Sequence, residues 1–335
     1  MSQKNFLTHF AKRIEEIWTG SEENTDLLEY LFRTQKSFSS KFIDQENLSL
    51  EEKERLTQEF ALALHNEVSS LVREINFKHH ASERKDIVKN SILFEGIDCF
   101  RYLLAIMNLW GFTADEFLEA FDDKAAYLDI KYNNDKEWAG QPVVLVDVDD
   151  VVANFREGYA DYLNSLDGVN VDVNSSEYYF TEGIPREKYN PELVFQDFIE
   201  ARMLRTLTVD QSMISAVNDL YDKGYWIHVL TARPDWNQTC KYDTYTWLSN
   251  SGLKFHRISF SPEKMIWAAK SKYYDGNAIF CAIDDSPKHS REYAKHGVKV
   301  ISPKKPYNSE LESVDNVFVV KSGDEVEAVI QNFNE

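Results

Sequence analysis

The stretch VVLVDVDDVVANF, residues 143 to 155, places three aspartates directly after a run of apolar residues. A continuous apolar run is typical of a strand that is buried on both faces of a parallel sheet. Adjacent carboxylates repel each other, so Asp147, Asp149 and Asp150 need a reason to share the end of such a strand. Residues two apart in an extended segment point to the same side. Asp147 and Asp149 can therefore face one crevice, where a cation would relieve their repulsion.

Short apolar runs with helical segments between them follow this stretch. They are WIHVLT (226–231), RISF (257–260), IFCAI (279–283), VKVI (298–301) and VFVV (317–320). Strands that alternate with helices predict a doubly wound α/β domain with a Rossmann-like parallel sheet. About 75 residues separate the first two runs, too many for a simple crossover. We therefore expect a helical cap inserted at about residues 156–212.

The N-terminal half follows a different pattern. Its apolar residues recur every three or four positions, which predicts an all-α helical bundle with helices near residues 4–18, 24–43, 50–78, 84–110 and 113–131. Ser49 and Thr113 are expected to cap two of these helices. The stretch KYNNDKEWAGQP breaks the helical pattern and serves as a linker. We expect two domains, residues 1–137 and 138–335.

Composition restricts the class of protein. The chain of 335 residues has 37 basic and 56 acidic side chains, a net charge of −19, which disfavours binding to long nucleic acid. Its three cysteines are scattered without the spacing of a zinc site or a disulfide framework. No apolar run approaches the roughly 18 residues that span a bilayer, and the N-terminus carries no signal-peptide core. We expect a cytoplasmic protein that does not associate with membranes.

Polar residues end several of the predicted strands. Asp284 and Asp285 follow the run IFCAI, Thr231 closes WIHVLT, and Lys264 comes shortly after RISF. Ligands of open parallel sheets bind outside the carboxyl ends of the strands, and ligand sets made only of oxygen favour Mg²⁺. Each signal alone is more often a helix cap or a solvated surface group. Four such signals at strand ends predict a phosphate site that contains Mg²⁺.

The order DVDDVV, LTAR, lysine and IDD resembles the four motifs of the haloacid dehalogenase-like (HAD-like) phosphohydrolases over residues 142–325. The resemblance implies that Asp147 is a nucleophile that forms an aspartyl phosphate. It implies that Asp149 protonates the leaving oxygen and later activates water, while Thr231 and Lys264 bind the phosphoryl group. The implied Mg²⁺ ligands are Asp147, Asp149, Asp284 and Asp285, and the implied substrate contacts are Arg233 and Phe155.

Within that superfamily, DVDDVVANF looks closest to the 5′(3′)-deoxyribonucleotidases, whose motif reads DxDGVxADF. Asp150 stands where that group has glycine, so the backbone there is open to question. The segments around TARPDW and AIDDSPKHS are also similar to polynucleotide-kinase 3′-phosphatase domains, although the acidity of the chain weighs against a polymer substrate. Four aromatic residues of the cap, Phe155, Tyr178, Tyr179 and Phe180, are candidates for stacking on a base.

The helical half contains a second acidic pattern. Residues three apart share a helix face, so Glu95 lies with Asp98, and Glu67 with Ser70 and Glu74. This half resembles the all-α nucleoside triphosphate pyrophosphatases of the dimeric dUTPase and MazG-like group, whose signature is ExxE followed by ExxD around Mg²⁺. Ser70 replaces the second glutamate, for which Glu74 is a substitute. The resemblance implies Mg²⁺ ligands at Glu67, Glu74, Glu95 and Asp98 and substrate contacts from Gln35, Lys78 and Lys124.

Together these patterns predict a bifunctional, Mg²⁺-dependent nucleotide hydrolase. The helical domain would cleave a deoxynucleoside triphosphate, dUTP or dCTP, to the monophosphate, and the HAD-like domain would remove the last phosphate. The expected partners are small nucleotide substrates and a second copy of the chain, bound through the helical domain. Three alternatives stay open: a nucleotidase whose degenerate helical domain only dimerises, a polynucleotide 3′-phosphatase, and a nucleotide-binding protein without turnover.

Overall fold

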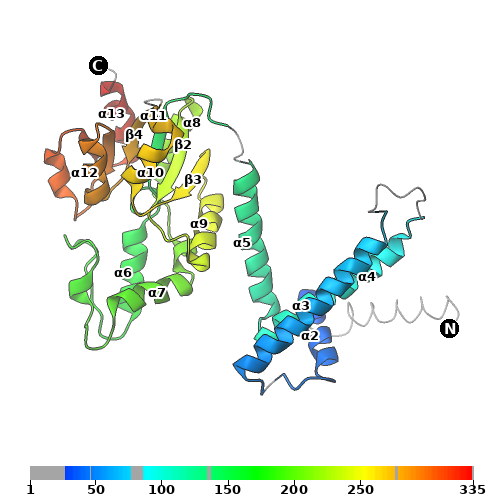
Figure 1. Cartoon of the computed structure of the whole chain (residues 1–335). Coiled ribbons are helices and arrows are strands. Elements are labelled where there is room, and N and C mark those ends of the chain that lie inside the picture. Colours follow the sequence, from blue (N-terminus) through cyan, green and yellow to red (C-terminus); the bar gives the residue numbers. More distant parts are fainter. Residues whose placement is uncertain (1–26, 46, 77–85, 134–136, 276–277, 334–335) are drawn as a thin grey trace. The chain divides into compact units, whose positions relative to one another are not determined.

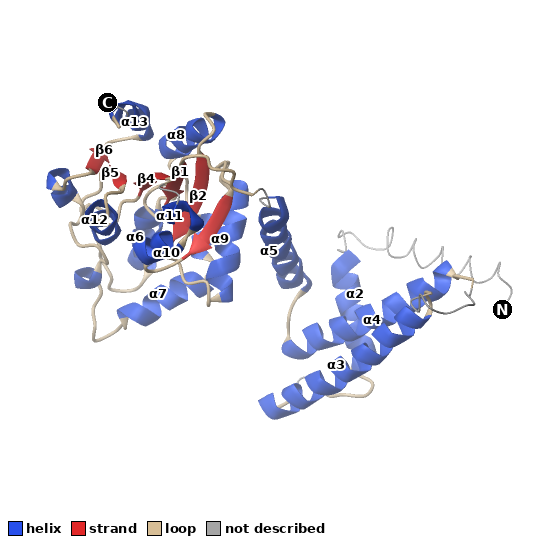
Figure 2. Ribbon diagram, turned by 45° about the horizontal axis from the view of Figure 1, so that its top comes forward, coloured by secondary structure: helices blue, strands red, loops and turns tan. Residues whose placement is uncertain are grey.

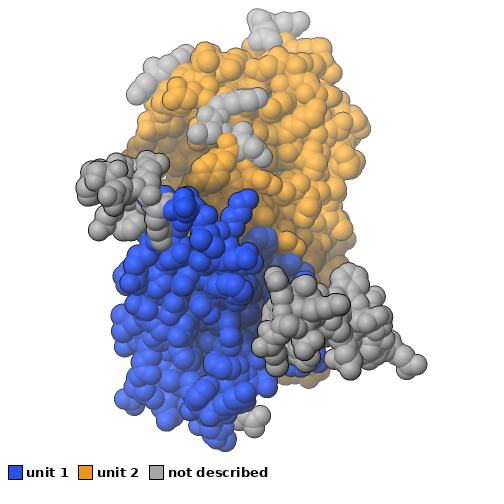
Figure 3. Space-filling model, turned by 90° about the vertical axis from the view of Figure 1, so that its right-hand side faces the viewer, with its two compact units in different colours: residues 1–121 blue, residues 122–335 orange. Residues whose placement is uncertain are grey.

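The computed structural model describes residues 27–45, 47–76, 86–133, 137–275 and 278–333. The chain divides into two compact units, residues 1–121 and 122–335, which Figure 3 colours separately. The division falls inside helix α5 (Ala114–Asn133). The boundary expected after residue 137 stays a prediction, and the helix expected at residues 4–18 lies outside the described residues.

Unit 1, in its described part, is built from helices α2 (Leu27–Ser39), α3 (Leu50–Arg73), α4 (Lys89–Trp110) and the beginning of α5. Ser49 caps α3 as predicted, because its hydroxyl accepts a hydrogen bond from the amide of Glu52 while the carboxylate of Glu52 accepts from the amide of Ser49. Thr113 and Glu116 form the same reciprocal pair before α5. A small core around Phe32, Leu104 and Ala114 holds these helices together.

The C-terminal part of α5 packs within unit 2. Asp123 is buried, accepts a hydrogen bond of 2.7 Å from the Thr246 hydroxyl and pairs with Arg202. Ile130 belongs to the main core of that unit, and the ring of Tyr127 lies 4.9 Å from that of Tyr245. These contacts explain why the second half of α5 belongs to unit 2.

Unit 2 contains a six-stranded sheet in the order β3-β2-β1-β4-β5-β6, and every neighbouring pair is parallel. The strands are β1 (Val143–Val146), β2 (Trp226–Thr231), β3 (Arg257–Phe260), β4 (Ile279–Ile283), β5 (Lys299–Pro303) and β6 (Val317–Val320). Each coincides with one of the predicted apolar runs to within two residues at either end. The predicted parallel α/β sheet is confirmed.

Both faces of the sheet are buried, because alternate strand residues point to opposite sides. Val144 and Val146 face one core, and Val143 and Leu145 face the other. The first core includes residues of α8 (Gln211–Asp222), α9 (Gln238–Asn250) and α13 (Val326–Asn332). The second includes residues of α10 (Lys264–Lys270), α11 (Lys272–Asp275) and α12 (Pro287–Lys295). Figure 2 shows the strands in red among these helices.

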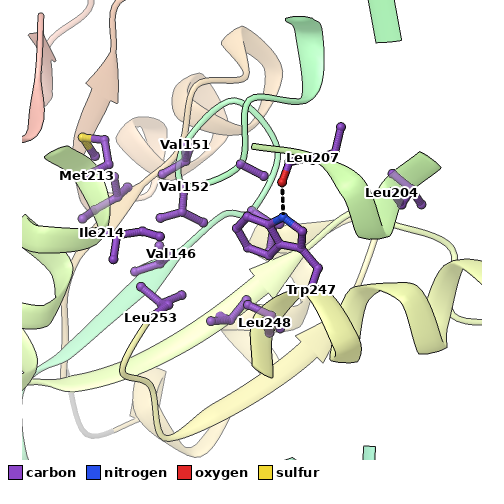
Figure 4. Packing of buried hydrophobic residues seen from close by; sticks show 14 of the residues in the cluster. Val146, Val151, Val152, Leu204, Leu207, Met213, Ile214, Trp247, Leu248 and Leu253 are labelled. Carbon is purple, nitrogen blue, oxygen red and sulfur yellow. Dashed lines mark hydrogen bonds between the residues drawn. The ribbon is translucent and has the colours of Figure 1, made fainter. Parts of the chain in front are cut away.

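The segment between β1 and α8 forms an insertion. It contains α6 (Phe155–Ser165), α7 (Pro191–Glu200) and two short 3₁₀ helices, η1 (Thr181–Gly183) and η2 (Met203–Thr206). In Figure 1, α6 and α7 (green) lie together at one end of the sheet. The Trp247 indole on α9 donates a 2.8 Å hydrogen bond to the carbonyl of Leu207, just after η2, and packs among Val152, Leu248 and neighbouring apolar side chains (Figure 4). The insertion is thereby attached to the core of the sheet.

Among the described helices, none combines the length and the apolar composition that crossing a bilayer requires.

Candidate functional site

The parallel register of β1 and β4 brings the two acidic motifs together. Val146 pairs with Ile283, so the next residues, Asp147 and Asp284, occupy equivalent positions on adjacent strands. The backbone ladder continues beyond the strands, because the amide of Asp147 donates to the carbonyl of Ile283 at 2.9 Å and that of Asp284 donates to Ile301 at 3.1 Å. These hydrogen bonds hold the backbone of both aspartates at the carboxyl edge of the sheet.

This edge is also the topological switch point of the sheet. From β1 the chain continues to β2 on one side, whereas from β4 it continues to β5 on the other. The connections diverge there and leave a crevice, which is where doubly wound sheets bind their ligands. Asp147 and Asp284 therefore lie where such a fold places a ligand.

Lys264 connects the two aspartates. It lies at the start of α10, and its Nζ is 2.8 Å from Asp147 Oδ1 and 2.8 Å from Asp284 Oδ2. The side chains of all three are at least nine-tenths buried. Burial alone would lower the pKa of Lys264, but the carboxylates of Asp147 and Asp284 raise it above its ordinary value, so the side chain is held as a cation.

One lysine does not neutralise the acidic cluster. Carboxylate oxygens of Asp147, Asp284 and Asp285 lie within 4.8 Å of one another, and all three residues are buried. Burial raises the pKa of Asp147 to about 7; Lys264 opposes this shift, and the negative charges of Asp284 and Asp149 add to it. Burial also raises the pKa of Asp285, and the neighbouring carboxylates, that of Asp150 first, add to the effect.

The donor set fits a divalent cation. Asp147 Oδ1 and Asp284 Oδ2 share the single positive charge of Lys264. Three buried carboxylates that converge within 4.8 Å carry more negative charge than one lysine balances, and a divalent cation would balance the rest. Since all the converging donors are oxygens, Mg²⁺ suits the cluster better than a soft metal ion.

The sequence resemblance also implied that Asp149 is a metal ligand and the acid and base. In the structure its side chain contacts an arginine. Arg233 holds it in a bidentate ion pair, with Nη2 2.6 Å from Oδ1 and Nε 3.0 Å from Oδ2. Arg233 also donates to the hydroxyl of Thr244. Thr231 is fully buried at the end of β2, and its hydroxyl accepts a hydrogen bond from the amide of Arg233. The two β2-end residues and Asp149 thus form one network.

Asp150 stands where the similar deoxyribonucleotidase motif has glycine, and it adopts a left-handed backbone with φ of 55°. Non-glycine residues rarely take this conformation unless surrounding contacts hold them in it. Here Asp150 Oδ1 accepts a 2.8 Å hydrogen bond from the amide of Arg156, and Oδ2 accepts one of 2.9 Å from the Tyr307 hydroxyl. The hydrogen bonds of the buried Asp150 carboxylate therefore hold the left-handed backbone conformation that glycine would adopt readily.

A cavity of about 1020 Å³ opens in front of these groups. It is lined by Asp147, Asp149, Lys264 and Asp285, and also by aromatic residues of the insertion. These aromatic residues are Phe155, Tyr159, Tyr178, Tyr179, Phe180 and Phe195. Phe155, which was expected to contact substrate, stands at the start of α6, and its ring stacks on that of Tyr159 at 5.6 Å.

Tyr178, one of the cap aromatics expected to stack on a base, lines the cavity, and so does Arg156, which was not predicted. The Arg156 guanidinium donates to the carbonyls of Val173 (2.7 Å), Ser175 (2.5 Å) and Tyr178 (3.3 Å). The hydroxyl of Tyr178 reaches Ser286; burial of the hydroxyl and the nearby carboxylates, Asp285 first, raise its pKa. Tyr307 and His289 also line the cavity. No spacing rule marks Arg156, Tyr307 or His289, because segments far apart in the sequence bring them to the cavity.

Unit 1 contains a second group of carboxylates. Glu67 on α3 and Glu95 and Asp98 on α4 bring oxygens within 4.8 Å of one another, which is the juxtaposition expected from their helical spacing. Cys99 is next to them, and its pKa is raised by partial burial and by the charges of Glu67, Asp98 and Glu95. Large apolar side chains of α3 and α4 are exposed, among them Leu62, Leu93, Phe94 and Ile97.

The other residues expected in the helical site are placed differently. Gln35 is buried, its Nε2 donates to Ser39 Oγ and its Oε1 accepts from Arg101 Nε. Glu74 caps the end of α3 and is not a member of the carboxylate group. Lys124 lies in unit 2, where its Nζ donates to the Tyr242 hydroxyl at 2.9 Å. Lys78 lies outside the described residues.

Comparison with known proteins gives likenesses only at the level of solved structures. No protein-family model and no curated protein matches the chain. A HAD family hydrolase from Deinococcus radiodurans R1, solved with bound phosphate and sodium, is 16% identical with a TM-score of 0.42, covering 59% of this chain and 98% of its own. CbbY from Rhodobacter sphaeroides, solved with phosphate, is 13% identical with a TM-score of 0.40, covering 56% of this chain and 96% of its own. The chain is thus similar to a HAD family hydrolase and to a phosphate-bound protein.

Proposed function

We propose that unit 2 is a Mg²⁺-dependent phosphatase that hydrolyses nucleoside monophosphates through a phosphoaspartate on Asp147. The observation that carries this proposal is the bridge from Lys264 Nζ to Asp147 and Asp284, 2.8 Å each, at the switch point of the sheet. A buried lysine that bridges two carboxylates beside an open cavity can also meet the oxygens of a phosphoryl group. The HAD-like motif order supports the same assignment.

In the first step, a carboxylate oxygen of Asp147 forms a bond to phosphorus while the bond from phosphorus to the ester oxygen breaks. Asp149 supplies the proton that the leaving oxygen takes. In the second step, Asp149 removes a proton from water, which attacks the phosphoaspartate and releases phosphate. Arg233 contacts both carboxylate oxygens of Asp149 and so fixes the orientation of the group that exchanges the proton.

The acidic cluster would hold Mg²⁺ through Asp147, Asp284 and Asp285, and the ion would neutralise charge on the phosphoryl oxygens. Lys264 contributes a fixed positive charge from the protein itself. Backbone hydrogen bonds to Ile283 and Ile301 keep Asp147 and Asp284 at the sheet edge, so the cluster is formed before substrate arrives.

The cavity favours a substrate with one phosphate and a flat, uncharged leaving group. Its aromatic wall suits stacking on a base. The cations that line it in the described structure are already engaged: Arg233 with Asp149, Lys264 with two aspartates, Lys288 with Glu263, and Arg156 with backbone carbonyls. A polynucleotide would bring further phosphates to a wall that also carries Glu192 and Glu310. This argues for a mononucleotide over the 3′-phosphatase alternative.

A second activity is proposed for unit 1, the cleavage of a deoxynucleoside triphosphate to the monophosphate and pyrophosphate. The convergence of Glu67, Glu95 and Asp98 supports it, because a triphosphate is bound through such carboxylate-held Mg²⁺. The exposed Leu62, Leu93 and Phe94 support the expected homodimer, since a second copy of the helical unit would remove them from water.

Two substitutions test the assignment in the full-length chain. We expect Asp147→Asn to abolish phosphate release from nucleoside monophosphates, by at least about 10³-fold, while leaving pyrophosphate release from triphosphates intact. Glu95→Gln should have the reverse effect. Both are read by a phosphate assay on mono- and triphosphates with Mg²⁺, with and without added inorganic pyrophosphatase.

The outcomes separate the alternatives. A wild-type protein that releases phosphate but ignores all triphosphates would reduce the helical unit to dimerisation. Mg²⁺-dependent nucleotide binding without any turnover would leave only a binding protein. Loss of both activities in either variant would argue against two separate sites.

A further inference from the structure

Tyr307 lies between two of the buried aspartates. It follows β5 in the segment KKPYN, and its hydroxyl is 2.5 Å from Asp285 Oδ2 and 2.9 Å from Asp150 Oδ2. All three residues are more than nine-tenths buried. The hydroxyl has one proton and two carboxylate acceptors, so it is the donor that separates two negative groups.

The Tyr307 side chain is itself held on several sides. The side-chain Nδ2 of Asn308 donates to the backbone carbonyls of Asp285 (3.0 Å) and Pro303 (2.8 Å), which fixes the loop to the backbone of the acidic motif. The rings of Tyr307 and Tyr178 meet edge to face with centroids 4.9 Å apart. The Arg156 guanidinium lies 5.0 Å from the Tyr307 ring. The hydroxyl is therefore presented to the aspartates from a rigid support.

This placement restricts Asp285. One of its oxygens, Oδ2, accepts from Tyr307, while a carboxylate oxygen of the same residue lies within 4.8 Å of oxygens of Asp147 and Asp284. A hydrogen bond on one carboxylate oxygen limits rotation of the group about its last torsion. Without the hydroxyl, Asp285 and Asp150 would face each other with no donor between them, and their repulsion would turn Asp285 away from the cluster.

We propose that Tyr307 is a positioning residue that orients Asp285 to hold the divalent cation, by hydrogen-bonding Asp285 and Asp150 at once. The inference rests on the proposed metal site of unit 2. It adds Tyr307, a residue outside the acidic motifs, to the residues on which that site depends. Partners behind metal ligands commonly change metal affinity by about 10- to 100-fold when they are removed.

The test measures Mg²⁺ binding by isothermal titration calorimetry on the full-length chain carrying Glu95→Gln, so that the carboxylate group of unit 1 does not contribute. Asp284→Asn in this background should remove the remaining heat of Mg²⁺ binding. Its loss would assign that heat to the site in unit 2. We expect Tyr307→Phe to raise the Kd for Mg²⁺ by about 10-fold or more. Tyr307→Phe combined with Asp150→Asn should recover much of the affinity, because the repulsion is gone.

Tyr273→Phe is the matched control. Tyr273 is also buried, and its hydroxyl bridges Trp226 Nε1 and His228 Nδ1 in the second core. We expect Tyr273→Phe to lower the midpoint temperature of thermal unfolding without changing the Kd for Mg²⁺. A parent that binds no Mg²⁺ at the unit 2 site would overturn the metal site and this inference with it. If the parent and Tyr307→Phe bind Mg²⁺ with the same Kd, only the positioning role is overturned. The same holds if Tyr273→Phe loses as much Mg²⁺ affinity as Tyr307→Phe.

Discussion

The buried Arg233 and the partly exposed Asp149 form a bidentate ion pair, with Nη2 2.6 Å from Oδ1 and Nε 3.0 Å from Oδ2. The pair joins the loop after β1 to the loop after β2 and orients the carboxylate proposed to act as acid and base. A planar guanidinium fixes both carboxylate oxygens, whereas an ammonium group binds as a point charge.

Arg233→Lys is therefore expected to reduce kcat for phosphate release by about 10- to 100-fold, with a smaller change in KM, because Asp149 loses its fixed orientation. Thr244→Val is the control, since it removes the hydroxyl that accepts from Arg233 Nη1 and donates to the carbonyl of Cys240 but leaves the bidentate contact with Asp149 in place. Steady-state kinetics on a nucleoside monophosphate give both values. An Arg233→Lys enzyme with the wild-type kcat would contradict a role for the bidentate geometry.

Asp150 offers a test of backbone strain. Its left-handed φ of 55° is accessible to glycine at no cost, but it costs alanine roughly 1 kcal/mol. Both substitutions remove the hydrogen bonds to Arg156 and Tyr307. We expect urea unfolding of unit 2 to rank wild type above Asp150→Gly, and Asp150→Gly above Asp150→Ala by about 1 kcal/mol. Equal stability of the two variants would show that the loop changes conformation.

His228 should make the fold sensitive to acid. It is buried on β2, its ring nitrogens contact Tyr273 and Ser259, and burial, with a smaller contribution from Arg257, lowers its pKa to about 3. Above about pH 6.5, the pKa of histidine in the unfolded chain, the ring is neutral in both the folded and the unfolded state, and its titration does not lower the stability. Between about pH 6.5 and 3 the unfolded chain binds a proton that the folded protein does not, so stability falls by about 1.4 kcal/mol per pH unit.

The measurement compares wild type with His228→Gln. The variant should be less stable at pH 7.5 because it loses buried hydrogen bonds. At pH 5 the difference in unfolding free energy between wild type and variant should be smaller by about 2 kcal/mol. Only the wild type has an imidazole that is protonated in the unfolded chain and neutral in the folded protein. A gap independent of pH would mean that His228 accepts a proton in the folded state.

Gly323 is predicted to be irreplaceable for packing reasons. A Cβ at this position would lie 2.0 Å from the carbonyl oxygen of Ser212, at the start of α8, and that neighbour is backbone. We expect Gly323→Ala to destabilise unit 2 by about 3 kcal/mol or more in urea unfolding. The same substitution at Gly96, inside α4 with no atom within 4 Å of the new Cβ, should instead stabilise unit 1 by up to about 1 kcal/mol. A stable Gly323→Ala protein would contradict the close approach.

The sequence by itself determined the sheet and the ends of its strands. Apolar runs such as IFCAI are typical of strands buried on both faces of a parallel sheet, and Asp147 and Asp284 follow two of these runs directly. Helical spacing likewise anticipated that Glu95 and Asp98 share a face. These features are local, because periodicity and strand ends depend on neighbouring residues along the chain.

Only the tertiary structure decided which partner each charge has. The pairing of Asp149 with Arg233, the left-handed backbone of Asp150 and the position of Tyr307 between Asp150 and Asp285 depend on loops that are distant in sequence. Lys124 was expected beside a triphosphate and instead contacts Tyr242 in unit 2. Burial and long-range packing set the partner of a side chain, and no pattern of spacing encodes them.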